Sequence, residues 1–269
     1  MSTPDKRLRL VTSRQNSLVK DLRRAFTQGE TTADGYCAAE GIRLLEEAIR
    51  SSLRFKALFV SESAQERAQR LMPQIASHVE AILLPDDIFN SAVQTEAPQG
   101  VAALVKLKTQ SLEDVLQHPD PLVLGAAGVQ DPGNLGTMIR SAEAFGAVAV
   151  LAAEKTVNPL NPKVVRSSAG SIFRLPVFKT DWRAALAAMR ERGMRIVATS
   201  SHKGVPVDEA DLRGPLAIYV GSEGAGVPRE ILAEADEIIA IPHSPRVESL
   251  NAGIAASIIL YEAARQRRS

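Results

Sequence analysis

Short apolar runs alternate with helix-like segments along the second half of the chain. The runs are apolar nearly throughout, which is typical of strands buried on both faces of a parallel sheet. The predicted strands cover residues 122–126, 147–152, 172–177, 195–199, 216–220 and 237–241. The predicted helices cover residues 135–145, 162–169, 182–192, 229–234 and 249–267. This alternation predicts an α/β unit whose parallel sheet is covered by helices and binds ligands at the carboxyl ends of its strands.

The first part of the chain predicts a smaller α/β unit. Helical periodicity covers residues 12–27, 40–53, 63–78 and 85–92, and strands are predicted at 55–60, 80–84 and 100–105. A charged and polar stretch follows and ends between Pro119 and Pro121. We therefore expect a first domain at residues 1–106, a linker at 107–120 and a second domain at 121–269, both of normal domain size.

Composition excludes several classes of protein. Apolar residues make up 45% of the chain, yet no apolar run reaches membrane-spanning length. No apolar segment follows the charged N-terminus, so no secretory signal is visible. Cys37 is the only cysteine, which excludes an internal disulfide and is typical of a cytoplasmic protein. The four histidines lack the spacing of a metal site, so we expect no metal.

Charge is distributed unevenly along the chain. The net charge is only +1, which by itself says nothing about nucleic acids. Residues 1–24, however, carry seven basic residues against two acids. Such a patch is suited to phosphates, although a solvated helix face explains it equally well.

The loop after the first strand of the second domain is rich in turn-forming residues. It reads Asp131-Pro-Gly-Asn-Leu-Gly136 and leads into a helix. We expect Asn134 to cap that helix and Arg140, two turns into it, to lie near a strand end. An arginine there is able to hold a phosphate with its planar guanidinium. The alternative is an ordinary turn followed by a surface arginine.

Two further loops follow late strands. Gly221-Ser-Glu-Gly-Ala-Gly226 has glycines that let backbone amides approach a ligand, and an unusual acid, Glu223. Its glycine spacing is not that of a dinucleotide-binding loop, and no phosphate-loop lysine follows. The last loop starts at Ile241-Pro and ends at Glu248-Ser-Leu-Asn251, where we expect Ser249 to cap the final helix. A buried helix behind a proline turn explains this loop equally well.

Together, the three loops resemble the three signature motifs of the SpoU (TrmH-like) family of the SPOUT superfamily. Members of this family are S-adenosylmethionine-dependent RNA ribose 2′-O-methyltransferases. The order and spacing of the motifs agree over residues 120–265, and residues 163–177 also follow the family's pattern. The first domain resembles more loosely the family's substrate-binding domain, which is similar to a small ribosomal-protein RNA-binding fold. That resemblance is carried by Ala39-Glu-Gly-Ile-Arg43, Phe59-Val-Ser61 and Pro98-Gln-Gly-Val101.

The resemblance implies a fold, a cofactor and an oligomeric state. The second domain is expected to be a parallel-sheet SPOUT domain tied in a deep trefoil knot, a rare exception among folds. The cofactor S-adenosylmethionine is expected to bind in the knot, held largely by backbone groups. The corresponding residues here are Thr199, Ser200, Gly221, Ile241, Leu250 and Asn251. The family is dimeric with its site at the interface, so we expect a homodimer.

The resemblance also assigns the chemistry. The implied catalytic residues are Arg140, Asn134, Glu223, Ser249 and Asn251. Because arginine stays protonated, we expect Arg140 to stabilise the developing ribose alkoxide and grip the adjacent phosphate, while the proton passes to a phosphate oxygen or water. The other four residues are expected to orient Arg140, the ribose and the methionine moiety.

A few residues depart from the family's pattern. His243 and Pro245 stand where methionine and glycine are usual in the third motif, and Gly253 and Ala127 replace residues that are often serine and acidic. The polar residues of the chemistry are all present. We expect RNA as the partner, with large-subunit ribosomal RNA ahead of transfer RNA. The alternatives are a non-catalytic RNA-binding or ribosome-assembly factor, and a nucleotide-dependent oxidoreductase, which the glycine spacing disfavours.

Overall fold

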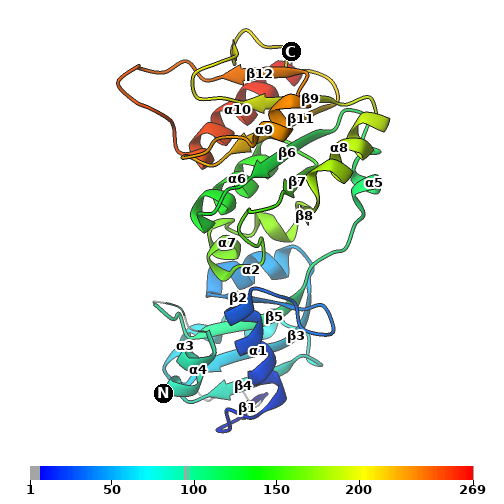
Figure 1. Ribbon diagram of the computed structural model, residues 1–269. Helices are drawn as coiled ribbons and strands as arrows, with labels where there is room; N and C mark the ends of the chain where they lie inside the picture. Colours follow the sequence, from blue (N-terminus) through cyan, green and yellow to red (C-terminus); the bar gives the residue numbers. More distant parts are fainter. Residues whose placement is uncertain (1–6, 94, 96, 269) are drawn as a thin grey trace. The chain divides into compact units, whose positions relative to one another are not determined.

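The structure, a computed structural model, describes residues 7–93, 95 and 97–268 (Figure 1). Residues 1–6 of the N-terminal basic patch lie outside the described residues. The contacts within the chain divide it into two units, residues 1–108 with 160–173, and residues 109–159 with 174–269. In the described part of the chain, no helix is long and apolar enough to cross a membrane.

The first unit is built on a mixed five-stranded sheet in the order β1-β4-β3-β5-β2. Its strands are β1 (Leu8–Leu10), β2 (Cys37–Glu40), β3 (Arg54–Ser61), β4 (Glu80–Leu84) and β5 (Val101–Lys106). β1 and β3 are parallel to β4, whereas β5 is antiparallel to β3 and β2. Its helices are α1 (Ser17–Gln28), α2 (Ile42–Arg50), α3 (Gln65–Ala68), α4 (Asp86–Val93) and α7 (Pro162–Ser167).

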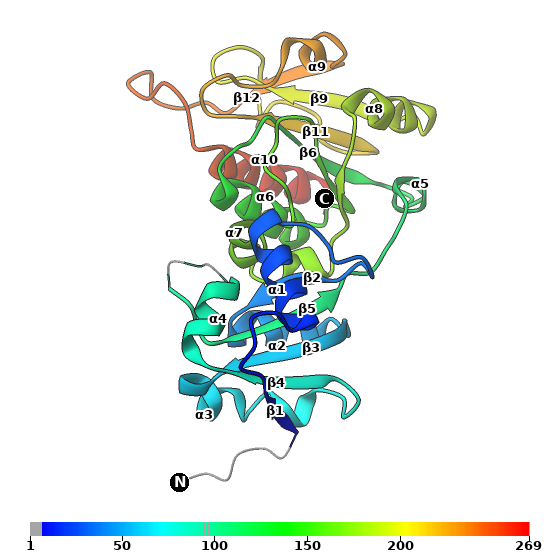
Figure 2. The same cartoon turned by 60° about the horizontal axis from the view of Figure 1, so that its bottom comes forward.

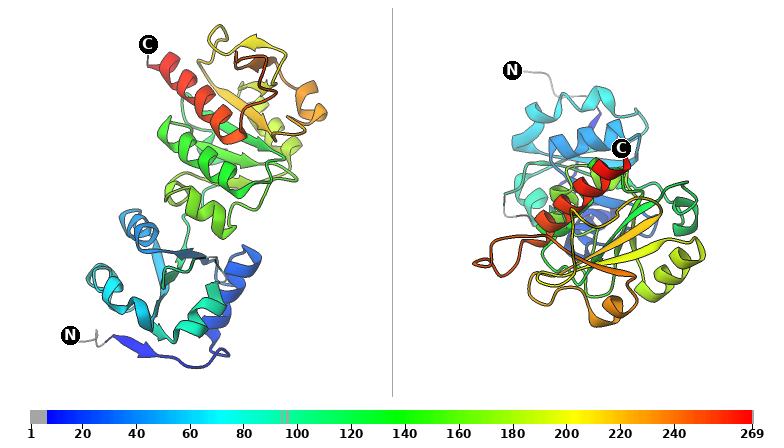
Figure 3. Two further views of the ribbon diagram at one scale, coloured as in Figure 1. Left: turned by 90° about the vertical axis from the view of Figure 1, so that its left-hand side faces the viewer. Right: turned by 90° about the horizontal axis from the view of Figure 1, so that it is seen from above.

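Helices cover both faces of this sheet. α1 and α4 pack together on one face (Figure 2), where Leu22 and Phe89 are buried in one core with Phe59 and Leu104. α2 lies on the opposite face (left view of Figure 3), with Leu45 fully buried. Asn16 caps α1 by accepting hydrogen bonds from the first-turn amides, as expected for an asparagine before an amphipathic segment.

The second unit contains a seven-stranded sheet in the order β10-β12-β9-β11-β6-β7-β8, and every pair of neighbouring strands is parallel. The strands are β6 (Leu122–Ala127), β7 (Ala149–Ala152), β8 (Val177–Lys179), β9 (Arg195–Thr199), β10 (Val205–Pro206), β11 (Leu216–Gly221) and β12 (Glu237–Ala240). The helices are α5 (Leu112–Val115), α6 (Pro132–Ala144), α8 (Trp182–Glu191), α9 (Arg229–Ala233) and α10 (Ala252–Arg267). The predicted α/β architecture with a parallel sheet is confirmed.

Helices also cover both faces of the parallel sheet. α6 and α10 lie side by side on one face (left view of Figure 3). α8 and α9 contribute Leu186, Met189 and Ile231 to the core on the other face, together with Val123 and Tyr219 of the sheet. The sheet is therefore buried on both sides, which explains why its strands read as apolar runs.

Both predicted helix caps of the motif loops are wrong. α6 starts at Pro132, and its cap is Asp131, whose Oδ1 accepts from the Asn134 amide at 2.8 Å. Proline is well suited to the first helical position, which moves the start of α6 ahead of Asn134. α10 starts at Ala252, and its cap is Asn251, which accepts from the Ile254 amide at 3.2 Å. Ser249 instead remains in the loop before the cap.

The predicted strand at 172–177 is mostly wrong. The segment forms a 3₁₀ turn, Ser171–Phe173, and only Val177–Lys179 joins the sheet as β8. Ala169 and Gly170 adopt left-handed φ angles of 50° and 92°, which end α7 and turn the chain before an extended run can form. Residues 160–173 also belong to the first unit by their contacts, although the sequence analysis includes them in the second domain.

Candidate functional site

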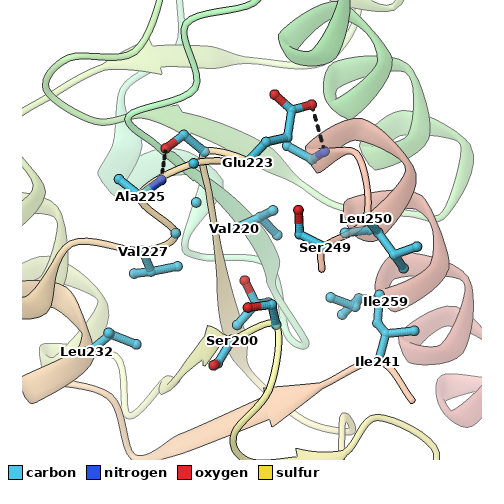
Figure 4. Close-up of a pocket in the computed structure, with 18 of the residues that line it drawn as sticks. Ser200, Val220, Glu223, Ala225, Val227, Leu232, Ile241, Ser249, Leu250 and Ile259 are labelled. Atoms are coloured by element: carbon cyan, nitrogen blue, oxygen red, sulfur yellow. Dashed lines mark hydrogen bonds between the residues drawn. The ribbon is translucent and has the colours of Figure 1, made fainter. Parts of the chain in front are cut away.

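A pocket of about 260 Å³ lies in the second unit at the carboxyl ends of β9, β11 and β12 (Figure 4). Thr199 and Gly221 are the last residues of β9 and β11, and Ile241 directly follows β12. All three line the pocket, which the start of α10 closes with Ala252 and Ala255. Ligands of parallel sheets bind at this edge, because the strand-end loops converge there.

The pocket contains most of the residues predicted to bind the cofactor. Thr199, Ser200, Gly221, Ile241 and Leu250 all line it. The sixth, Asn251, does not line it but caps the adjacent helix. Among the residues predicted to be catalytic, Ser249 and Glu223 line the pocket, whereas Asn134 and Arg140 do not.

The loop after β11 folds back tightly on its own strand. The Gly226 amide donates to the Ser222 carbonyl at 2.9 Å, and these two residues form an isolated β-bridge. A Cβ atom on Gly221 would lie 2.0 Å from the Gly226 carbonyl carbon and 2.1 Å from the Val227 nitrogen. Both obstacles are backbone atoms, so only glycine fits at position 221.

The lining of the pocket favours a neutral or cationic ligand. Among the described residues that line it, none is a lysine or arginine, and the one carboxylate is that of Glu223. Apolar side chains form two walls, with Leu250 and Ile259 across from Val227 and Leu232 (Figure 4). Hydroxyls and backbone groups supply the polar contacts. The arginine and lysine side chains that often hold a phosphate are thus not among the described residues of this lining.

A hydrogen-bond network joins the three motif loops. The Oε1 atom of Glu223 accepts from Asn134 Nδ2 at 2.6 Å, from Asn251 Nδ2 at 2.8 Å and from the Ala252 amide at 3.3 Å. Asn251 Nδ2 also donates to Asn134 Oδ1 at 2.8 Å. The Glu223 carboxylate therefore lies at the N-terminus of α10, where the helix dipole favours a negative charge. Three segments distant in sequence are fixed together beside the pocket.

Arg140 lies apart from this network. It is exposed on α6 and makes no side-chain hydrogen bond or ion pair with any residue that the structure describes. Four of the five residues predicted to be catalytic are thus brought to the pocket or its network, and Arg140 is not. Its guanidinium remains available for a ligand or for a partner outside this chain.

Sequence reasoning missed part of the pocket. Its apolar walls are formed by Val220, Leu232 and Ile259, which the sequence analysis placed only within a strand and two helices, and by Val227 of the glycine-rich loop, which was given no role. His243 also lines the pocket, and its Nδ1 donates to the Ile241 carbonyl at 2.7 Å. Because a carbonyl only accepts, Nδ1 is the ring nitrogen that carries a proton in this bond. The presence of a histidine where methionine is usual in the third motif could have marked this position as part of the pocket.

Comparison with known proteins relates both parts of the chain to described families. Residues 121–261 match the model of the SpoU rRNA Methylase family. Residues 16–103 match the model of an MRM3-like substrate binding domain. Among curated proteins, the 23S rRNA (guanosine(2553)-2′-O)-methyltransferase RlmP of Bacillus subtilis is 32% identical over 254 residues, which cover 94% of this chain and 98% of RlmP.

Solved structures extend the similarity to the whole chain. The AdoMet-bound rRNA methyltransferase from Sinorhizobium meliloti superposes with a TM-score of 0.82 at 28% identity, covering 96% of this chain and 98% of the other. The SpoU methyltransferase AviRb from Streptomyces viridochromogenes, in complex with AdoMet, gives a TM-score of 0.81 at 28% identity, covering 95% and 99%. The strand-end pocket, the motif network and the family models agree, and the chain belongs to the SpoU rRNA methylase family.

Proposed function

We propose that this protein is an S-adenosylmethionine-dependent RNA methyltransferase that methylates a ribose 2′-hydroxyl. The observation that carries the proposal is the strand-end pocket, which has a glycine cradle at Gly221 and no basic side chain among its described lining residues. A sulfonium nucleoside is cationic and lacks phosphates, so it suits a pocket with this lining. Relatives that share the family and nearly the whole length of the chain are named as rRNA methyltransferases or were solved with AdoMet.

The residues of the pocket fit the cofactor's chemical parts. Thr199, Ser200 and Ile241 offer strand-end backbone and hydroxyl groups for polar edges of the ligand. Gly221 allows close approach of backbone, and Leu250 provides an apolar wall. Asn251 acts indirectly, by capping α10 and holding Glu223. When bound, S-adenosylmethionine supplies the methyl group, and the chain supplies position and charge.

Arg140 is the proposed charge-stabilising group of the reaction. An arginine remains protonated at neutral pH, so it is suited to stabilise the developing alkoxide and to grip the adjacent phosphate. The ribose proton then leaves to a phosphate oxygen or to water. Asn134, Glu223 and Asn251 hold the motif loops in register, and Ser249 lines the pocket beside them. Since Arg140 does not line the pocket of its own chain, we assign it to the pocket of a neighbouring subunit.

We further propose that the protein is a homodimer formed through α10. Ile254, Ile258 and Tyr261 lie on this helix at spacings of four and three residues and are 53%, 38% and 56% exposed. Large apolar side chains clustered on one exposed helix face are typical of an interface. The small residues of the same helix, Ala252 and Ala256, are instead buried.

The proposed substrate is ribosomal RNA of the large subunit. RlmP, which aligns over nearly its whole length with this chain, is named for a guanosine of 23S rRNA. Transfer RNA is the second candidate. Because the substrate is ribosomal RNA and the single thiol, Cys37, is free and buried, we infer a cytoplasmic location.

Two measurements test the proposal together. Calorimetry with S-adenosylmethionine and, separately, with NAD(P) should give binding of the first alone. Ribosomal and transfer RNA from a deletion strain should then be mapped for missing 2′-O-methyl groups and offered to the purified protein. We expect one ribosomal ribose to be methylated. Cofactor binding without methyl transfer to any RNA would favour the non-catalytic assembly factor, and NAD(P) binding would favour the oxidoreductase.

A further inference from the structure

The first unit contains a cavity of about 730 Å³ that the proposed reaction does not use. The cavity lies against the N-terminal turn of α2 and is bordered by α3 and α7. Among the described residues that line it, five are arginines and three are glutamates. The arginines are Arg43, Arg50, Arg67, Arg70 and Arg166.

Ion pairs neutralise three of these arginines. Arg166 Nη2 lies 2.6 Å from Glu40 Oε2, and Arg50 Nη1 lies 2.6 Å from Glu47 Oε1. Arg70 Nε lies 3.3 Å from Glu46 Oε1. Within the described part of the chain, each lining glutamate is therefore paired with a lining arginine, and two arginines of the lining remain without a partner.

The two remaining arginines have no counterion among the residues that the structure describes. Arg43 and Arg67 are exposed, and neither makes a hydrogen bond or ion pair with the residues that the structure describes. Two guanidinium groups on one cavity repel each other, and an anion between them would relieve that repulsion. A guanidinium presents a planar fork of N–H donors that matches a phosphate.

The backbone adds to this positive charge. Gly41, Ile42 and Leu44 also line the cavity, and they form the cap and first turn of α2. The cap residue is a glycine, and no side chain of the described residues accepts a hydrogen bond from the first-turn amides. The positive end of the α2 dipole and the two unpaired guanidiniums therefore act on the same space.

The floor of the cavity is firmly built. The Glu40 side chain, only 2% exposed, accepts from the Gln99 amide at 2.7 Å, from Thr95 Oγ1 at 3.0 Å and from Arg166 at 2.6 Å. These bonds satisfy a buried carboxylate and hold Arg166 in place. Arg166 comes from residues 160–173, so the cavity combines that segment with the N-terminal part of the chain.

We propose that this cavity binds backbone phosphates of the RNA substrate through Arg43 and Arg67. The inference rests on the proposed function, which supplies RNA as the substrate. No aromatic side chain is among the described residues that line the cavity, so it lacks a platform on which a base could stack. The site thus holds the RNA strand by its charge and not by stacking a base on an aromatic ring.

The test compares two double variants of the full-length protein. Arg43→Gln with Arg67→Gln removes both unpaired cavity charges. Arg54→Gln with Arg192→Gln removes two exposed arginines that do not line the cavity and have no side-chain partner among the described residues. The probe is a fluorescent fragment of large-subunit ribosomal RNA, titrated at several salt concentrations. Inorganic phosphate and a mononucleotide serve as competitors.

We expect the cavity variant to bind the RNA at least about tenfold more weakly at low salt. Its plot of log affinity against log salt should flatten by about 1.4, the value for two lost contacts to a single strand. The methylation rate at saturating RNA should stay near that of the wild type. The loss should therefore raise KM for the RNA and leave kcat unchanged. The control variant should keep most of its RNA affinity.

Three results would overturn the phosphate site. The first is a salt slope of the cavity variant that equals that of the wild type. The second is an equal loss of RNA affinity in the control variant. The third is an RNA affinity that does not change when Arg43 and Arg67 are replaced, even if the wild type binds phosphate or the mononucleotide strongly. Calorimetry with S-adenosylmethionine on the same preparations separates the two proposals. A protein that does not bind the cofactor contradicts the proposed function, while the RNA comparison still tests the cavity.

Discussion

Gly221 is the pocket residue at which an added side chain would meet the closest obstacles. An alanine Cβ would collide with the backbone of Gly226 and Val227 at 2.0 and 2.1 Å, so the loop would have to open. We expect Gly221→Ala to lower S-adenosylmethionine affinity by about tenfold or more, since a misplaced loop loses several backbone contacts. Gly224→Ala is the control in the same loop, because a Cβ there meets nothing within 4 Å. Equal S-adenosylmethionine affinities for the two variants, measured by calorimetry, would contradict the proposed role of Gly221 in the pocket.

Arg140 tests the chemistry rather than the pocket. It has no partner among the described residues of its own chain, so Arg140→Ala should leave the fold and the cofactor affinity near wild type. The single-turnover rate should fall by about a hundredfold or more, the scale for losing one well-placed charge-stabilising donor. Arg140→Lys should recover little, since an ammonium does not reproduce the planar fork. A dimeric Arg140→Ala protein with an undiminished methylation rate would contradict the assignment of Arg140 as the charge-stabilising group.

At the scale of elements, apolar runs were a dependable guide to the interior strands. β9 and β11 are buried on both faces, and their runs predicted them to within a residue. The helix caps were harder, because Asp131, Asn134, Ser249 and Asn251 are all good capping types and the sequence alone does not rank them. The Glu223 network joins residues 89 and 117 positions apart, which local periodicity does not reveal.

The last helix carries a pH-sensitive ion pair. Arg265 donates to Glu262 at 2.8 and 2.7 Å, and Gln266 donates at 2.8 Å. These bonds, that of Arg265 foremost, lower the pKa of Glu262 from 4.5 to about 2. Because the folded-state pKa is lowered, the carboxylate stabilises the fold above pH 4.5, and this contribution is lost as the pH falls from 4.5 towards 2.

We therefore expect Glu262→Gln to reduce the free energy of unfolding at pH 6 by about 0.5 kcal/mol, as for other helix-surface ion pairs. The difference from wild type should become smaller as the pH is lowered from 4.5 to about 3, and it should approach zero near pH 2. Urea denaturation at pH values across this range measures it. Glu191→Gln, which removes an exposed helical carboxylate without an ion pair in the described chain, should show no such pH dependence. A constant difference would contradict the role of the pair.

At the scale of the whole molecule, the exposed apolar face of α10 predicts a homodimer formed through this helix. Ile258 is 38% exposed in the single chain, so Ile258→Glu should not disturb folding. Buried in a dimer interface, however, the same carboxylate would be desolvated without a partner. We expect sedimentation velocity to show a dimer for the wild type and a monomer with a native circular dichroism spectrum for the variant. Leu10→Glu, at an exposed apolar site in the first unit, is the control. A dimeric Ile258→Glu protein would move the interface elsewhere.

The order of strands in the sheet was not predictable from the sequence. Apolar runs predict that strands exist and are buried, but they do not specify that β11 lies between β9 and β6. Apolar runs also do not specify whether the chain passes through one of its own loops. The trefoil knot therefore remains a prediction from the family resemblance. The short edge strands β1 and β10 also escaped the sequence analysis, since three and two residues are too few for a periodic signal.

The grouping of residues 160–173 with the first unit limits how such proteins recombine. A single crossover near residue 108 would give a hybrid whose first part meets a foreign α7. Buried Glu40 would then face whatever residue that α7 carries in place of Arg166, and the foreign counterparts of Val164 and Phe173 would pack on a surface with which they did not evolve. The first unit is therefore inherited as two separated stretches of sequence, which have to be exchanged together.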